Sequence, residues 1–323
     1  MIPKRLSVSF ALLSLVSLAT GLSAQRQSLP GSKSAVAAFD LGFAMPDTGP
    51  KLRMPTGEDA AATEPATPPV THRLAEFLAG VATGLNMPLE DVQPLGGRYV
   101  VALGGARELD ALEQLLAKAR TQQQTQFELA IRMYSLPAKF AAAKLPGLLG
   151  VDPAGKPARV AVLDRAAADG FLQTLDAAHD LDVMHAPKVA ARNLQPVTLS
   201  VLQYSSYVKD YTVRSEPGQV IADPVVGTVW DGFSIDATCL ELDSGRIAMR
   251  VAIEHQNVAK PIEERATTLP GTKLPVTVQV PRVSGVRAKQ MAILVWGGAG
   301  VLAAPKEDGS WLVVVTRCEP VAR

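Results

Sequence analysis

The chain has 323 residues, of which 47% are hydrophobic and 20% are charged, and it contains only two cysteines. Its 32 Lys and Arg residues balance 31 Asp and Glu residues, so the formal charge is +1, or −1 once Lys4 and Arg5 are subtracted with the segment described next. This balance excludes nucleic acid as the main partner, because nucleic-acid binding needs a clustered excess of Lys and Arg. Two cysteines are too few for a disulfide scaffold or a four-thiolate zinc site.

Residues 1–24 have the three-part pattern of a secretory signal peptide. Lys4 and Arg5 precede an uncharged apolar run over residues 6–18, and small residues at 21–24 precede Gln25. The apolar run is shorter than the ~20 residues that a membrane-spanning helix needs, so a retained N-terminal anchor is the weaker alternative. We therefore expect an exported protein.

The two cysteines are a candidate disulfide. Export would place Cys239 and Cys318 in an oxidising compartment. Each lies in an apolar run rich in β-branched residues, so neighbouring strands would bring them together. Two separate buried thiols remain the alternative, and a catalytic thiol is disfavoured because no histidine lies near either cysteine in the sequence.

The chain after residue 24 divides into three segments, and together they predict an α+β protein. Residues 25–71 contain seven prolines among Ala, Thr, Ser and Gly, which predicts a disordered linker. Residues 72–127 combine two helical apolar stripes with a short apolar strand, which predicts a small α/β module. In residues 128–323, runs rich in Val, Ile and Thr are separated by turn signals, which predicts a predominantly antiparallel β domain.

Two local patterns support this division. Phe127, Leu129 and Ile131 alternate with polar or small residues, so they predict a strand with one buried face, and we expect them to anchor the junction between the module and the β domain. Asp164 precedes a helical pattern that runs to Ala178, so it is the expected N-cap of that helix.

Four stretches resemble the bacterial secretin family, the outer-membrane channel subunits of type II and type III secretion and of type IV pilus systems. Residues 98–105 (RYVVALGG), the leucine-rich helix after them and the strand from Phe127 are similar to the family's small ring-building module. Residues 182–201 (DVMHAPKVAARNLQPVTLSV) resemble the segment that leads into the family's core, with Pro187 and Asn193 setting its turn. Residues 232–254 resemble the long core hairpin, and residues 290–298 and 311–320 resemble the closing strands.

The resemblance implies a non-enzymatic, ring-shaped homo-oligomer in the periplasm or outer membrane, with secretion-system proteins as partners. Two stretches depart from the family pattern: the run over residues 299–310, which is short and charged, and the stretch that ends at residue 232. Residues 201–232 are few and include Lys209, Asp210, Arg214, Glu216 and Asp223, which leaves little room for two membrane-crossing strands. The alternative is a soluble periplasmic binding or scaffold protein that keeps the secretin core without forming a pore.

Signals for an enzyme are weak. Ser206 and Lys209 have the Ser-x-x-Lys spacing of penicillin-recognising enzymes, but neither Ser-Asp-Asn nor Lys-Thr-Gly follows them. The four histidines are scattered without metal-ligand spacing, and we expect His255 at a solvated strand end. The sequence therefore predicts no catalytic residue, no cofactor and no metal ligand.

Overall fold

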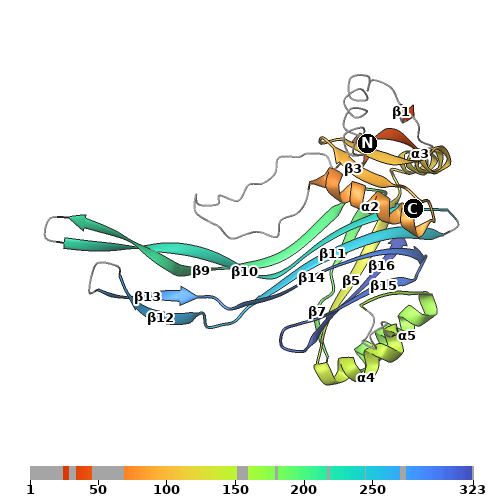
Figure 1. Cartoon of the computed structure of the whole chain (residues 1–323). Helices are drawn as coiled ribbons and strands as arrows, with labels where there is room; N and C mark the ends of the chain where they lie inside the picture. Colours follow the sequence, from red (N-terminus) through yellow and green to blue (C-terminus); the bar gives the residue numbers. More distant parts are fainter. Residues whose placement is uncertain are drawn as a thin grey trace, which may run out of the picture.

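The computed structural model describes residues 25–28, 34–45, 69–150, 159–178, 181–216, 219–243, 245–269 and 274–321. The expected signal peptide, residues 1–24, lies outside these ranges. The described chain has an α+β fold, as the sequence predicts. An α/β module lies on a two-sheet β sandwich, from which a long arm of strands extends (Figure 1).

The module is a four-stranded sheet, in the order β1-β2-β4-β3, with two α-helices packed against it. Its elements are β1 (Gln25–Ser28), β2 (Ser34–Asp40), η1 (Gly42–Ala44), α2 (Val70–Gly84), β3 (Asp91–Leu95), β4 (Tyr99–Gly105) and α3 (Ala106–Thr121). These strands correct the linker prediction, because residues 25–28 and 34–40 lie in the sheet. β2 pairs along its whole length with β4, from Ser34 opposite Gly105 to Asp40 opposite Tyr99. Its strand structure depends on that distant partner.

The first sheet of the sandwich has the order β14-β11-β10-β9, and all its pairings are antiparallel. Its strands are β9 (Val197–Glu216), β10 (Gln219–Glu241), β11 (Arg246–Val258) and β14 (Val283–Val295). The second sheet has the order β6-β15-β16-β5-β7, and β8 also pairs with β5. Its strands are β5 (Gln126–Leu136), β6 (Val160–Leu163), β7 (Asp182–His185), β8 (Lys188–Arg192), β15 (Ala299–Pro305) and β16 (Trp311–Pro320).

The two sheets enclose the main apolar core. Phe233 and Ile235 of β10 meet Phe127 and Leu129 of β5 there, and all four are essentially inaccessible to solvent. The opposite face of the second sheet is covered by α4 (Ala138–Leu149) and α5 (Arg165–Asp176). The Asp164 carboxylate accepts a hydrogen bond from the Ala167 amide at 2.8 Å, which confirms the predicted N-cap of α5.

The arm consists of the outer parts of β9 and β10 together with the hairpin of β12 (Glu263–Thr268) and β13 (Pro275–Val280), as Figure 1 shows. The Tyr211 hydroxyl donates to the Thr277 carbonyl at 3.1 Å, and the Val208 amide donates to the Gln279 side chain at 3.0 Å. The expectation that residues 201–232 leave little room for two long strands is wrong, since β9 covers residues 201–216 of this stretch and β10 covers residues 219–232.

Gly232 lies on β10 where the arm leaves the sandwich. Its φ angle is +131°, and a Cβ atom at this position would lie 2.1 Å from the carbonyl oxygen of Val201 on the paired strand. Both the backbone angle and the close approach require a residue without a side chain. The join between arm and sandwich therefore depends on this glycine.

We expect Gly232→Ala to lower the free energy of unfolding by about 3 kcal/mol, because the new methyl group adds a clash to an unfavourable φ angle. Chemical denaturation followed by circular dichroism measures the loss. Gly97→Ala is the matched control, because nothing lies within 4 Å of a Cβ at that turn position. Equal stability of the two variants would contradict the assignment.

Candidate functional site

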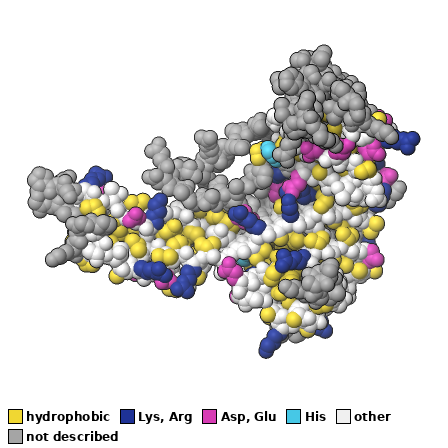
Figure 2. Space-filling view, in the orientation of Figure 1, with side chains coloured by type: hydrophobic (Ala, Val, Ile, Leu, Met, Phe, Trp, Pro, Cys, Tyr) yellow, Lys and Arg dark blue, Asp and Glu magenta, His cyan; other side chains and the backbone are white. Residues whose placement is uncertain are grey.

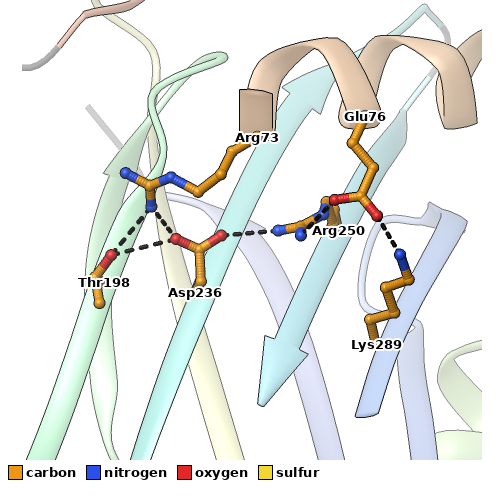
Figure 3. A network of polar contacts seen from close by, with 6 residues as sticks. All are labelled: Arg73, Glu76, Thr198, Asp236, Arg250 and Lys289. Carbon is orange, nitrogen blue, oxygen red and sulfur yellow. Dashed lines mark hydrogen bonds and ion pairs between the residues drawn. The ribbon is translucent and has the colours of Figure 1, made fainter. Parts of the chain in front are cut away.

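Helix α2 lies across the first sheet and is held there by a network of charged side chains (Figure 3). Asp236 of β10 is at its centre. This carboxylate accepts hydrogen bonds from Arg73 of α2 and, at 2.8 Å, from Arg250 of β11. The Thr198 hydroxyl of β9 donates to Asp236 at 3.2 Å and accepts from Arg73 at 3.1 Å.

A second carboxylate extends the network to β14, the strand at the opposite edge of the sheet. Glu76 of α2 accepts from Arg250 at 2.7 Å and from Lys289 of β14. Through Glu76 and Arg73, one helix is therefore connected to all four strands, from β9 to β14, as Figure 3 shows.

The centre of this network is buried. The side chains of Arg73 and Arg250 are each 8% exposed, and that of Asp236 is 13% exposed. Burial, and next the positive charge of Arg250, lower the pKa of Arg73, which nevertheless stays charged at neutral pH. Burial raises the pKa of Glu76, but its hydrogen bonds to Lys289 and Arg250 and their charges outweigh this, so the pKa lies below its usual value. These contacts position the module on the sheet.

We expect Asp236→Asn to reduce the free energy of unfolding by about 3 kcal/mol, because two buried guanidinium groups lose their shared counter-charge. Asp223→Asn on the same strand is the control. Its ion pair with Arg214, at 3.2 Å, is solvent-exposed and should contribute less than about 1 kcal/mol. Denaturant titration of both variants gives the comparison, and a loss at Asp236 no larger than at Asp223 would refute the role of the network.

The two outer strands of the first sheet present open edges. Among the described residues, β9 pairs with β10 alone and β14 with β11 alone. Four antiparallel strands alternate in direction, so β9 and β14 run in opposite directions. The edge of β9 is open along its inner part, whereas farther out Val208 and Tyr211 contact the β12–β13 hairpin. Open strand edges are templates for pairing with another chain.

The residues expected to anchor the module junction lie elsewhere. Phe127, Leu129 and Ile131 belong to the core between the two sheets, whereas the module has a separate core. Their alternating burial on β5 was predictable from the sequence. Their expected role at the junction between the module and the β domain is corrected, because the junction lies elsewhere. It is made by α2 on the first sheet, through charged side chains and through an apolar cluster that the module shares with Leu240 of β10 and Ala248 of β11. These residues are far apart in sequence, and no local pattern indicates such pairs.

Pro187 and Asn193 lie on either side of β8. The Pro187 carbonyl accepts from the Ile131 amide at 2.9 Å, which keeps the chain paired with β5 between β7 and β8. Asn193 is 1% exposed in the turn that leads into β9. Its side-chain oxygen accepts from the Glu241 amide at 2.9 Å, so it ties this turn to the end of β10.

Cys239 of β10 and Cys318 of β16 lie on facing sheets, not on neighbouring strands as expected. Their sulfur atoms are 3.3 Å apart inside the sandwich core, and the structure holds them as free thiols. The hydrogen bond to Cys318, followed by burial, raises the pKa of Cys239 well above its usual value, which disfavours a reactive thiolate. The pair is positioned to connect the two sheets.

We expect these thiols to form a disulfide after export. Closing a loop between residues 79 positions apart should add about 4 kcal/mol to the free energy of unfolding in the chain-entropy model. Mass spectrometry without reductant should show the loss of two hydrogens, and denaturation with and without reductant measures the gain. A double variant, Cys239→Ala with Cys318→Ala, should not respond to reductant, and free thiols in the exported protein would contradict the prediction.

The weak enzyme signals do not come together as a site. Ser206 and Lys209 are both exposed on β9, with Lys209 where the register between β9 and β10 shifts. His255 is 6% exposed, so its expected position at a solvated strand end is wrong. Burial, followed by the charge of Lys306, lowers the pKa of His255, which favours a neutral ring.

Within the described ranges, no three His, Cys, Asp or Glu side chains gather as a candidate metal site. The helices among these residues are all too short or too polar to cross a membrane.

Comparisons with known proteins find no matching family model and no curated relative. Solved structures similar to the chain include the Salmonella SPI-1 type III secretion injectisome secretin InvG, at 12% identity and TM-score 0.30, covering 76% of this chain and 78% of that one. They also include the V. cholerae type IV competence pilus secretin PilQ, at 10% identity and TM-score 0.31, covering 99% and 82%. The E. coli K12 type II secretion system secretin GspD aligns at 9% identity and TM-score 0.30, covering 98% and 67%. The function is therefore inferred from this chain's own residues.

Proposed function

We propose that this chain is an exported, non-enzymatic, secretin-like subunit that assembles as a homo-oligomer in a protein secretion or pilus apparatus at the outer membrane. The observation that carries the proposal is the pair of open edges on the first sheet. β9 and β14 run in opposite directions, so copies placed side by side in one orientation bring β14 of one copy antiparallel to β9 of the next.

The remaining surfaces of this sheet favour the same arrangement. Near the sandwich, α2 occupies one face and the second sheet occupies the other. Lateral strand pairing is therefore the contact left to this region. Pairing of two unlike edges is a heterologous contact, and it forms a ring when the rotation between copies closes. The order and spacing of the four secretin-like stretches support a ring of this kind.

The arm favours a second candidate, a soluble periplasmic scaffold that keeps the secretin core without a pore. On the face shown in Figure 2, apolar side chains along the arm are interleaved with Lys and Arg. Lys209, Asp210 and Arg214 are exposed, and the side chain of Asp223, the ion-pair partner of Arg214, is 46% exposed. A charge facing lipid costs about 2–4 kcal/mol at mid-depth, so these side chains oppose insertion of the arm.

The assembly state of the full chain, exported from a Gram-negative host, tests the proposal. We expect closed rings in the membrane fraction, seen by electron microscopy of the detergent extract. The same chain without residues 1–24 is the control and should stay in the cytoplasmic fraction. A soluble periplasmic species of one or a few copies would refute the ring and support the scaffold.

A further inference from the structure

Two valines of the edge strand β6 face the first sheet without being covered by it. Val160 is 43% exposed and Val162 is 51% exposed. They pair with Leu302 and Gly300 of β15, and directly opposed residues of an antiparallel pair share a face. Leu302 belongs to the sandwich core, and a Cβ at Gly300 would lie 3.0 Å from Met249 of the first sheet. Both valines therefore point towards the layer of the first sheet.

The first sheet ends at β14, beside these valines. The Gln290 side chain of β14 donates to the Ala161 carbonyl of β6 at 3.0 Å, which places β6 next to the open edge. Strands of one sheet lie about 4.8 Å apart, and stacked sheets lie about 10 Å apart. One more strand added to β14 would therefore lie over Val160 and Val162.

β9, at the opposite side of the molecule, has a matching apolar row on its inner face. The row consists of Val197, Leu199 and Val201, which pair with the core residues Ala237, Ile235 and Phe233. Val197 and Leu199 pack against the sandwich core of their own copy, whereas Val201 remains 49% exposed. An apolar row that faces the second layer is what the uncovered valines of β6 require.

Resting on the proposed homo-oligomer, we propose that β9 of one copy covers Val160 and Val162 of the next copy. The seam then has two layers that differ in chemistry. In the first sheet, β14 and β9 pair through their backbones. In the second sheet, the five strand positions from β6 to β7 alternate in direction, so both edges run the same way, and β6 has only four residues. That layer joins the copies through apolar side chains instead.

Cysteine cross-linking of the exported full chain tests this contact. Val162 and Val201 lie at opposite edges of one copy, so Val162→Cys combined with Val201→Cys can link only different copies. We expect oxidation of the double variant to give a ladder of three or more linked chains on a non-reducing gel. Either single variant should give dimers at most, because one introduced cysteine can link only two chains. Val162→Cys with Val226→Cys is the control, because Val226 is also 49% exposed but lies on the inner strand β10.

A second variant measures the contribution of the contact. Val160→Asp with Val162→Asp should raise the protein concentration at which rings dissociate about tenfold or more, whereas Val226→Asp should change it much less. If the wild-type chain forms rings, but the variant with Val162→Cys and Val201→Cys gives no ladder and the two aspartates leave the rings unchanged, this contact is overturned and the proposed function stands. A wild-type chain that forms no ring would overturn both.

Discussion

The shared counter-charge of Asp236 is the constraint on which the arrangement of the molecule depends. Arg73 reaches it from the module and Arg250 from the sheet, so the two parts are joined at a buried point. Removing two arginines and a carboxylate from water is costly, and their mutual hydrogen bonds offset part of that cost, while the Nε atoms of Arg73 and Arg250 stay buried without a partner. Because Thr198 and Lys289 extend the contacts to both outer strands, the helix holds the sheet at its full width.

This docking also determines which surfaces stay open. The first sheet is covered by α2 on one face and by the second sheet on the other. Its lateral edges and the arm are therefore the parts that stay accessible to another chain. A two-fold contact between two copies of β9 would leave both β14 edges open, and a two-fold contact between two copies of β14 would leave both β9 edges open. Repeated pairing of β14 with β9 leaves neither edge open, which is how a closed sheet avoids further growth.

Local patterns in the sequence predicted the parts of the fold that local physics determines. The alternation of Phe127, Leu129 and Ile131 identified β5, and Asp164 marked the start of α5. β2 was not predictable, because its alanine-rich segment becomes a strand through pairing with β1 and with the distant β4. The α2 network joins residues that are 163 and 174 positions apart, and the two cysteines meet across sheets. Spacing along the chain does not determine such contacts, so the sequence indicated the candidate pair but not its geometry.

The interactions that stabilise one copy are distinct from those proposed between copies. The sandwich core, the Asp236 network and the candidate disulfide all lie within one chain, so the subunit has its own sources of stability before it meets another. An isolated copy nevertheless exposes the inner part of the β9 edge and the two core-facing valines of β6, which are features that promote association. In the proposed assembly, the surfaces that remain open on the folded subunit are the ones that a neighbouring copy would cover.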